Sequence, residues 1–456
     1  MSAPHTRRAF LSAMAGAPRL LAQGRKSADV TLRIERAQIE VARGRTITTA
    51  TYNGTAPGPL IRMHEGVPCA VEIINHTDVA EYVHWHGFEI PPEWDGTEEE
   101  GSVSVPPGGH LRYEITPLNS GSRYVHSHAM AMNDLSRGVY SGQFAFVYVE
   151  PKRDPGRYDQ AIFLSTHEWE PRLVAEQDSE SAEDDEDESR GDSMEIRYGI
   201  RSINGKALGH GEPLRVKEGQ RVLFHILNAS ATENVQLYLP GHRFYVIALD
   251  GNPVPRPGYV SVLELGVGER VDALVAMNSP GVWILGSVAD DVRRSGLGIR
   301  LEYASRQGDP QYAPSGNLPW DYLRFGWSSE SPKPDEIIPM RILRAAPDEQ
   351  GMERWTINGC TYTQDTPKVL RRGQRYRLAF NNRTSEAHPV HLHRYSFELV
   401  RMGDSVTSGV TKDVLVLQPY QTAEVDFVPR EAGLALFHCH QQMHMEMGFK
   451  RLFRVL

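Results

Sequence analysis

The 456-residue sequence predicts an all-β protein made of three consecutive β-sandwich units. The first observation is a turn-like Asn-Gly pair that recurs at Asn53, Asn204 and Asn358. The second is a later glycine in each unit, followed nine residues on by an asparagine, at Asn75, Asn228 and Asn382. The third is that residues between this glycine and asparagine alternate between apolar and polar, as in strands with one buried face. A pattern written three times predicts three domains of one kind.

The later half of each unit repeats as well. A turn and an alternating strand lead to a glycine, and a marked position follows five residues later, as in Gly121 to His126, Gly281 to Gly286 and Gly433 to His438. Turn-forming residues between 151 and 156, and the Pro/Ser-rich stretch 305–334, are the natural joints. We therefore expect domains at residues 25–153, 154–306 and 307–456, each a β-sandwich.

Two segments are expected to lie outside these sandwiches. Thr6-Arg7-Arg8 opens a leader of small and apolar residues that resembles a twin-arginine export signal. We expect residues 1–24 to be a signal peptide and the mature protein to be exported, periplasmic or extracellular. Within the second unit, residues 178–192 carry the acidic run Glu183 to Glu188, which predicts a disordered insert.

Composition excludes several classes of function. A net charge of -9 and a pI near 6.1 give no basis for nucleic-acid binding. The sequence contains no apolar run near the roughly 20 residues that a membrane span needs. The three cysteines, Cys69, Cys360 and Cys439, do not form a disulfide framework. Cys69 and Cys360 are expected to be small hydrophobic residues, whereas Cys439 lies between two histidines.

Ten of the eighteen histidines fall in four short segments of units one and three. On a strand, residues i and i+2 share a face, so each His-x-His pair presents two imidazoles to one site. The repeat places these pairs at matching offsets, at His84/His86, His391/His393, His126/His128 and His438/His440. The same offsets in unit two give Leu237, Leu239, Gly286 and Val288. We expect units one and three to share a metal cluster at their interface, and unit two to supply no ligand. The remaining histidines, including His64, His167, His210, His225 and His242, are expected to have ordinary structural roles.

Cys439 indicates a second, distinct site. With His388 and His444 it forms the two-histidine, one-cysteine set of a blue-copper electron-transfer centre. Phe449, ten residues further on, occupies the expected axial position and cannot coordinate, which predicts a three-coordinate copper of high potential; Met447 is an alternative axial ligand. In an extended segment Cys439 faces away from His438 and His440. Electrons could then enter at one copper and leave at a multi-metal centre, where four of them suit the reduction of O2 to water.

These segments together resemble those of three-domain multicopper oxidases of the laccase type. The resemblance covers nearly all of the chain after the leader, and the pattern His438-Cys439-His440-x3-His444-x4-Phe449 is highly specific. It implies three cupredoxin-like Greek-key β-sandwiches and four copper ions, with the second domain free of copper. It assigns His388, Cys439 and His444 to type 1 copper and His84 and His391 to type 2 copper. It assigns the type 3 pair to His86, His126, His128, His393, His438 and His440.

The resemblance also implies roles beyond coordination. His444 is expected to lie nearest the reducing substrate, and Asp95 beside the cluster, where it assists proton delivery. An ordinary Asp-Gly turn is the alternative for Asp95. Two departures from the family pattern affect the proton route and the cluster surroundings. Gln442 and Met445 stand where relatives often carry an acid, and Tyr124-Val125 replaces the usual Trp-Tyr pair.

The implied activity is one-electron oxidation of a small reducing substrate, phenolic or aryl amine, coupled to reduction of O2. An oxidase of cuprous or other metal ions is the alternative, although the methionines gather only at Met443, Met445 and Met447. Copper nitrite reductase fits less well because it needs no cluster of eight histidines. An exported scaffold without activity would have lost ligands that this chain keeps. Three domains can close the site within one chain, so no oligomer is required.

Overall fold

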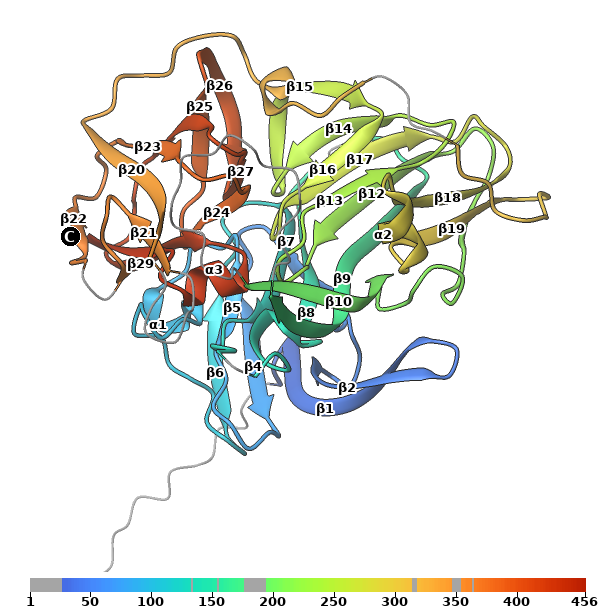
Figure 1. Cartoon of the computed structure of the whole chain (residues 1–456), viewed down its shortest axis with the longest axis horizontal. Helices are drawn as coiled ribbons and strands as arrows, with labels where there is room; N and C mark the ends of the chain where they lie inside the picture. Colours follow the sequence, from blue (N-terminus) through green and yellow to red (C-terminus); the bar gives the residue numbers. More distant parts are fainter. Residues whose placement is uncertain are drawn as a thin grey trace, which may run out of the picture.

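The computed structural model describes residues 27–132, 134–153, 156–175, 194–313, 318–346, 354–362 and 365–456. The expected signal peptide, 1–24, and the expected acidic insert, 178–192, lie outside these residues. In the described ranges no helix is both long and apolar enough to cross a membrane. The predicted all-β class is confirmed, since strands account for most of the elements (Figure 1).

The first third of the chain folds into two facing sheets of four strands each. The first sheet has the order β2 (Arg45–Tyr52), β1 (Val30–Ala42), β4 (Cys69–Asn75) and β6 (His110–Ile115). The second has the order β3 (Ile61–His64), β8 (Phe144–Glu150), β7 (Gly121–Ser127) and β5 (Val83–His86). Two short helices, α1 (Pro92–Asp95) and η1 (Gly138–Tyr140), lie in its connections.

The middle third forms a six-stranded and a five-stranded sheet. The larger contains β10 (Met194–Ile203), β9 (Gln160–Ala175), β12 (Arg221–Asn228), β17 (Arg270–Ala276), β14 (Phe244–Leu249) and β15 (Asn252–Val260). The smaller contains β11 (Leu214–Val216), β19 (Gly298–Tyr303), β18 (Val282–Ser287), β13 (Val235–Tyr238) and β16 (Val262–Leu265). The helix α2 (Asp290–Arg294) follows β18, and η2 (Tyr322–Phe325) lies on the way to the last third.

The last third repeats this arrangement. Its larger sheet contains β21 (Arg354–Ile357), β20 (Glu336–Ala345), β23 (Tyr376–Asn382), β28 (Thr422–Phe427), β25 (Phe397–Met402) and β26 (Ser405–Lys412). Its smaller sheet contains β22 (Lys368–Leu370), β30 (Lys450–Val455), β29 (Gly433–Cys439), β24 (His388–Leu392) and β27 (Val414–Leu417). One short helix, α3 (Gln442–Glu446), follows β29.

The repeated sequence features have a common structural role. In each unit the Asn-Gly pair takes positive φ at both residues, the conformation of a type I′ turn. Each of the marker asparagines, Asn75, Asn228 and Asn382, is fully buried and donates from Nδ2 to two backbone carbonyls. A buried amide that satisfies loop carbonyls stabilises the end of a strand. The three sandwiches are therefore built on the same turn and the same buried amide.

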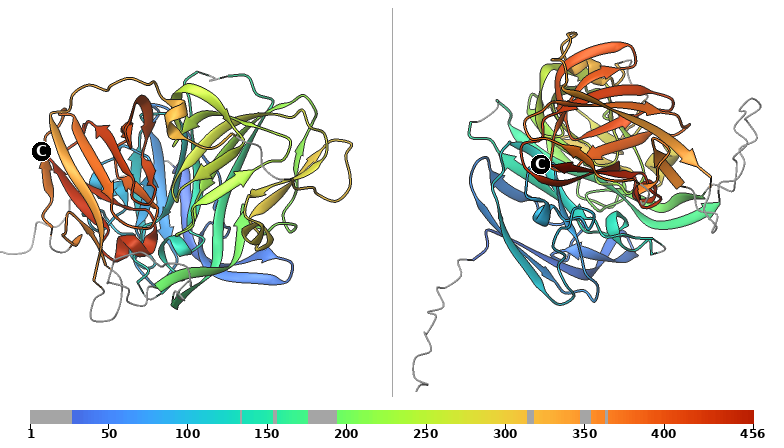
Figure 2. Two further views of the ribbon diagram at one scale, coloured as in Figure 1. Left: turned by 45° about the horizontal axis from the view of Figure 1, so that its top comes forward. Right: turned by 90° about the vertical axis from the view of Figure 1, so that its left-hand side faces the viewer.

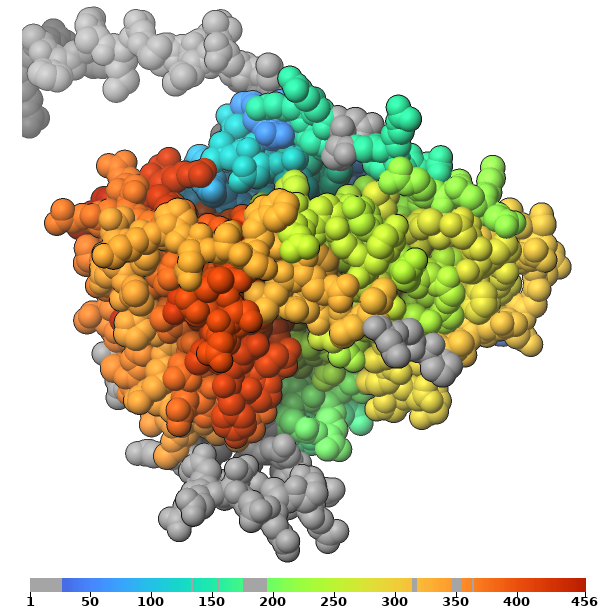
Figure 3. All heavy atoms as spheres, turned by 90° about the horizontal axis from the view of Figure 1, so that it is seen from above, coloured from blue at the N-terminus to red at the C-terminus, as the bar shows by residue number. Residues whose placement is uncertain are grey.

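The three sandwiches pack around a common junction (Figure 2). Apolar side chains of the second and third sandwiches form one continuous core that includes Phe244, Phe325 and Phe397. The segment from 318 to 335 runs between these two sandwiches and bridges them, with Ser261 donating to the Leu318 carbonyl at 3.0 Å and Trp327 pairing with Ser408. Figure 3 shows this orange segment lying across both sandwiches. The units are thus held in fixed relative positions, which a site shared between them requires.

A buried carboxyl in the second sandwich makes stability depend on pH. Glu168 on β9 accepts hydrogen bonds from Ser230 Oγ and the Ala231 N–H, yet burial and the charge of Glu233 raise its pKa to about 8. The folded state therefore holds this proton at pH values where the unfolded chain, with a pKa near 4.5, has lost it. Stability from this group is present below about pH 4.5 and declines by up to about 1.4 kcal/mol per pH unit until about pH 8.

Glu168→Gln should remove that decline. The variant is expected to gain stability relative to the parent chain as the pH rises from 5 to 8, with little difference at pH 5. Urea unfolding at pH 5, 6.5 and 8 measures this, with Glu195→Gln, an exposed carboxylate of the neighbouring strand β10, as the matched control. Parallel pH profiles for Glu168→Gln and the parent chain would contradict the expectation.

Candidate metal centres

The paired histidines lie on four strands whose register brings them together. β5 pairs with β7, so that His84 lies opposite His126. β24 pairs with β29 in the third sandwich, so that His391 lies opposite His438. The two sets then meet across the interface between the first and third sandwiches. Ring centroids approach to 4.0 Å for His84 and His393, 3.8 Å for His86 and His391, and 5.3 Å for both His126 and His440 and His128 and His438.

In this eight-histidine cluster some ring nitrogens are hydrogen bonded to the protein, whereas others have no hydrogen-bond partner. His84 Nδ1 donates to the Asp95 carbonyl at 2.8 Å, and His391 Nδ1 donates to the Asp413 carbonyl at 2.7 Å. His126 and His438 donate in the same way to the Ser127 and Cys439 carbonyls. Buried ring nitrogens without a hydrogen-bond partner remain at His84 Nε2, His126 Nε2, His391 Nε2, His440 Nδ1 and both nitrogens of His128.

Unpartnered buried nitrogens are costly unless they coordinate a metal ion. Burial lowers the pKa of His438 to about 3, and burial with the neighbouring imidazoles lowers the pKa of His86 and His393 well below the usual value. These three rings are therefore neutral, which is the form that binds metals. Donor atoms within 4.8 Å of one another include those of His84, His391 and His393, and those of His128, His393 and His438. The residues present fit a cluster of metal ions.

A second set of donors lies on the opposite side of β29. Cys439 Sγ is 3.6 Å from His444 Nδ1 and 3.9 Å from His388 Nδ1, and the two Nδ1 atoms are 3.2 Å apart. All three side chains are buried. Burial raises the pKa of the Cys439 thiol, so a nearby cation is needed to hold it as a thiolate. Sulfur and imidazole donors together favour copper over the hard cations.

An aromatic wall closes this second site. Phe449 is fully buried, and its ring centroid lies 5.1 Å from that of His388. Trp355 packs against His388, His444 and Phe449, with centroids at 4.7, 4.4 and 6.0 Å. The walls supply no strong ligand, and they keep the site dry. His444 is the most exposed of the three donor residues, at 8%, and its Nε2 lies 3.2 Å from Glu386 Oε2.

Asp95 is far from an ordinary surface turn residue. It ends α1 in a fully buried position, and its Oδ2 accepts from His393 Nδ1 at 2.8 Å while its carbonyl accepts from His84. Gly96 follows with a positive φ of 89°, and a Cβ there would lie 2.0 Å from the Val83 carbonyl oxygen. Glycine is thus required for α1 to approach β5 this closely. One aspartate therefore orients one histidine from each of two sandwiches, His393 through its carboxylate and His84 through its backbone carbonyl.

The residues expected to have no role in metal binding lie elsewhere. Leu237 and Leu239, at the equivalent offsets of the second unit, belong to its apolar core. The buried His167 and His242 are hydrogen bonded to the carbonyls of Ala229 and Pro240, and His225 is paired with Asp272. Cys69 is buried as expected, but Cys360 is exposed, because it follows the Asn358-Gly359 turn.

Sequence reasoning missed several polar residues at these centres. Asp413 Oδ1 accepts from His86 Nε2 at 3.0 Å, and Glu386 contacts His444. Glu100 lies 3.6 Å from His393 Nδ1, accepts from the Leu436 N–H at 2.6 Å, and has its pKa raised by burial and by Asp95. Asp413 and Glu386 are isolated acids in an ordinary sequence context. The run Glu98-Glu99-Glu100 beside Asp95-Gly96 was the single available signal.

The noted departures from the expected pattern also have structural consequences. The Tyr124 hydroxyl lies 2.9 Å from His440 Nε2, whereas Val125 points into the core of the first sandwich. Gln442 donates to Glu446 Oε1 at 2.6 Å. Glu446 in turn accepts from the N–H groups of Ala131 and Met132, which ties α3 to the first sandwich.

Comparisons with known proteins agree with this arrangement. Family models described as multicopper oxidase match residues 33–154, 175–295 and 334–456. The chain is 28% identical to the multicopper oxidase MmcO of Mycobacterium tuberculosis, over 93% of this chain and 86% of that protein. It is 24% identical to the L-ascorbate oxidase of Cucurbita pepo var. melopepo, over 88% and 90%.

Solved structures show the same fold. Fet3p, a multicopper oxidase that functions in iron import, matches with a TM-score of 0.78 and 17% identity, over 93% of this chain and 90% of that one. The laccase from Botrytis aclada matches with a TM-score of 0.75 and 19% identity, over 94% and 88%. The expected three cupredoxin-like domains are confirmed. The chain therefore belongs to the multicopper oxidases, copper-containing oxidoreductases that use O2 as the electron acceptor.

Proposed function

We propose that this protein is a laccase-like multicopper oxidase. It takes single electrons from a phenolic or aryl-amine donor at a type 1 copper and delivers them to a trinuclear cluster that reduces O2 to water. One observation carries the proposal: Cys439 Sγ contacts His388 and His444, while its sequence neighbours His438 and His440 belong to the eight-histidine cluster. A single residue thus joins an electron-entry site to a site that holds several metals.

The arrangement of donor atoms supports four coppers. His388, Cys439 and His444 would hold type 1 copper. His84 and His391 would hold type 2 copper; both use Nδ1 for a backbone hydrogen bond and keep Nε2 free, and their ring centroids lie 5.7 Å apart. The other six rings would hold the type 3 pair, three rings to each copper ion. The two groups are His86, His126 and His440, and His128, His393 and His438.

When bound, copper supplies the one-electron chemistry that couples four donor oxidations to O2 + 4 e⁻ + 4 H⁺ → 2 H2O. The protein's own groups orient and protect this chemistry. Asp95 fixes the tautomers of His84 and His393 and assists proton delivery at the cluster. Phe449 and Trp355 pack over Cys439 to exclude water and offer no donor atom, so a copper ion held by His388, Cys439 and His444 would have a high potential.

A specific contact also favours a second candidate, the oxidation of metal ions. Burial alone would raise the pKa of Glu386, but the His444 hydrogen bond and the charges of His444 and Arg344 lower it to about 2. A carboxylate therefore stays ionised beside His444 Nε2. In the proposed function His444 is the ligand nearest to the electron donor. An anion at this position attracts Cu(I) or Fe(II) as well as protonated aryl amines.

Glu386→Gln separates these donor classes. Loss of one charge about 4 Å from a singly charged donor costs about 1 kcal/mol in water, so kcat/KM for Cu(I) should fall about fivefold, and kcat/KM for the doubly charged Fe(II) should fall further. A neutral phenol should be affected much less. Initial rates with each donor measure this, and Glu302→Gln, which removes a carboxylate of the second sandwich, is the control. An equal fall for the neutral phenol would contradict the assignment of Glu386 to charge recognition.

The proposed function is tested by assaying the copper-loaded chain with a phenol, an aryl amine, Cu(I) and Fe(II) side by side. We expect four donors oxidised per O2 consumed, no release of hydrogen peroxide, and the highest kcat/KM with the organic donors. Highest kcat/KM with Cu(I) or Fe(II) would favour the metal-ion oxidase. A copper-replete chain without blue colour or O2 uptake would reject both oxidase functions and would favour a scaffold protein without activity.

The proposal includes the organisation and the location of the enzyme. We place domain boundaries at 25–153, 154–306 and 307–456, in keeping with β8 ending at Glu150 and β9 beginning at Gln160. The Thr6-Arg7-Arg8 leader would direct export of the folded enzyme. Cell fractionation of the parent chain and an Arg7→Lys, Arg8→Lys variant tests this location, with retention of the variant in the cytoplasm as the expected result.

A further inference from the structure

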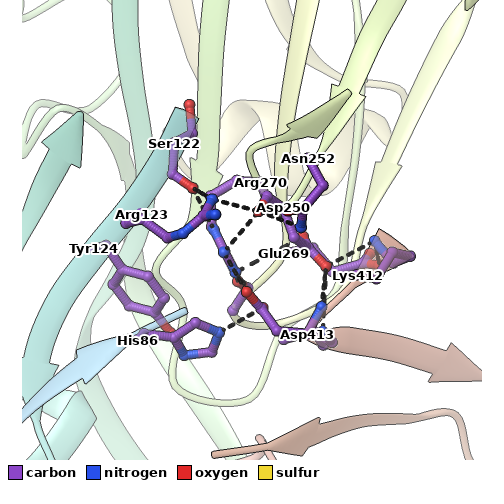
Figure 4. Close-up of polar contacts among 12 residues, drawn as sticks. His86, Ser122, Arg123, Tyr124, Asp250, Asn252, Glu269, Arg270, Lys412 and Asp413 are labelled. Atoms are coloured by element: carbon purple, nitrogen blue, oxygen red, sulfur yellow. Dashed lines mark hydrogen bonds and ion pairs between the residues drawn. The ribbon is translucent and has the colours of Figure 1, made fainter. Parts of the chain in front are cut away.

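A buried network of charged side chains lies where the three sandwiches meet (Figure 4). We call it the junction network. It joins Arg123 of the first sandwich, Asp250, Glu269 and Arg270 of the second, and Lys412 and Asp413 of the third, all with at most 1% exposure. Charges removed from water in this way are costly unless each is paired and hydrogen bonded. The partners of each buried charge therefore indicate which part of the molecule the network supports.

Asp413 is where the junction network meets the eight-histidine cluster. Its Oδ1 lies 3.0 Å from His86 Nε2, and its carbonyl oxygen lies 2.7 Å from His391 Nδ1. A carbonyl can only accept, so His391 carries its proton on Nδ1 and keeps Nε2 for a metal. If the Asp413 carboxylate also accepts, His86 carries its proton on Nε2 and directs Nδ1 into the cluster, where it lies 3.3 Å from His440 Nε2.

Arg270 makes Asp413 an acceptor. Its two terminal nitrogens donate to both carboxylate oxygens of Asp413, each at 2.6 Å. Two charge-assisted bonds to one carboxylate favour its ionised form, against the burial that raises the pKa of Asp413, and fix its plane. Asp250 fixes the same segment through the backbone, since its Oδ2 accepts from the N–H groups of Asp413 and Val414 at 3.2 Å. Lys412 Nζ closes the network at 3.0 Å from that oxygen.

A second contact from the middle sandwich reaches the cluster independently. Gly268 has φ of +84°, and a Cβ placed there would lie 2.9 Å from His440 Cδ2. Its backbone therefore packs directly against the His440 ring. Arg270 Nη1 also donates to the Gly268 carbonyl at 3.0 Å, so the same arginine holds this loop. Arg270 thus touches the supports of His86, His391 and His440.

We propose that the second domain, which contributes no ligand among the described residues, is the positioning element of the trinuclear site, with Arg270 as its central positioning residue. Arg270 holds Asp413 so that His86 and His391 present the correct nitrogens, and it fixes the Gly268 loop against His440. This inference rests on the proposed function only for the copper that the cluster binds. The tautomer of His86 in the copper-free chain follows from the geometry alone.

Arg270→Lys tests the proposal because it keeps the buried charge but loses the paired donors. The matched control is Arg377→Lys. Arg377 makes the same two-point contact with buried Asp426, at 2.7 and 3.1 Å, inside the third sandwich and away from the histidines. Asp413→Asn is the second variant, because its amide cannot accept from Arg270 at both atoms. All variants are full-length chains, studied with and without copper.

The first measurement is copper retention during dialysis against a chelator, with the blue absorption of the type 1 site as an internal reference. Supports of metal ligands typically contribute about 10- to 100-fold in affinity, so Arg270→Lys and Asp413→Asn should lose cluster copper at least about tenfold more readily. The type 1 colour should stay as in the parent chain. Arg377→Lys should retain both kinds of copper.

The second measurement needs no metal. Nitrogen NMR of the copper-free chain with 15N-labelled histidine reports which ring nitrogen carries the proton. We expect His86 protonated at Nε2 in the parent chain and in Arg377→Lys, and a mixture of tautomers in Arg270→Lys.

Several results would overturn the proposal. Parent-like cluster copper and an unchanged His86 tautomer in Arg270→Lys would reject the positioning role. So would a parallel loss of type 1 and cluster copper with the same fall in Tm as Arg377→Lys, since that is a general loss of folding stability. A parent chain that binds no cluster copper would reject the proposed function instead, and the tautomer measurement would still decide the role of Arg270.

Discussion

Cys439→Ser is expected to abolish oxidation of every donor while the cluster keeps its copper. Serine is close in size to cysteine, but its hydroxyl stays protonated and is a poor copper ligand. The type 1 site of His388 and His444 would then lose its thiolate and the covalent path to His438 and His440. Donor oxidation should fall at least about 10³-fold, the scale on which removal of one essential catalytic group acts.

Three readouts on one sample check this expectation. The blue colour should vanish, copper should fall by one ion per chain, and O2 uptake should stop with phenols, amines and metal ions alike. Cys360→Ser is the matched control, because that cysteine is exposed and lies outside both centres. Persistent blue colour in Cys439→Ser would show that another sulfur, such as that of Met447, supports the type 1 site.

His84→Asn is expected to stop the reaction at the O2-reducing cluster and to leave electron entry at the type 1 site intact. Asparagine Nδ2 can still donate to the Asp95 carbonyl in place of His84 Nδ1, so the local structure is preserved. The Nε2 donor that faces His391 is lost. The type 1 site should remain blue and should bleach when a donor is added, but the colour should not return in air. Turnover should fall at least about 10³-fold.

Single-turnover absorption in air measures this block. His167→Asn is the matched control, since His167 is also buried and also donates from Nδ1 to a backbone carbonyl, that of Ala229 at 2.8 Å. That variant should recover its colour at the parental rate. Recovery of colour in His84→Asn at the same rate would remove His84 from the O2-reducing cluster.

The two variants together distinguish electron entry from O2 reduction. Cys439→Ser should be colourless with an intact cluster, whereas His84→Asn should be blue with a stalled one. A chain in which both variants kept full activity would be inconsistent with any copper route through β29.

The fold and most of the donor set could be predicted because their signals are local. The alternation before Asn75, Asn228 and Asn382 reflects a two-residue strand period, and the same period places both imidazoles of a His-x-His pair on one face. The third-unit pattern from His438 to Phe449 spans a strand, a turn and α3, which bring Cys439 and His444 together within 3.6 Å. These relations need only neighbouring residues.

The supporting residues could not be predicted in this way. Asp413 follows an ordinary strand and lies 327 positions from His86, whose Nε2 it contacts. Arg270 and Asp413 are 143 positions apart. Glu386 is a single acid, and nothing in the run Glu98-Glu99-Glu100 distinguishes Glu100 from its neighbours. Their roles come from burial beside a histidine, and burial between sandwiches depends on how the sandwiches pack.

The sequence by itself determined that units one and three carry matched histidine pairs, that Cys439 lies between two of them, and that unit two has Leu237 and Leu239 at the equivalent positions. Only the tertiary structure decided that unit two nevertheless reaches the cluster, through Arg270 and the Gly268 loop. The physical reason is that coordination needs particular residue types at short spacing, which a sequence displays. The orientation of a ligand depends on hydrogen bonds across an interface, and these exist only after the domains have packed.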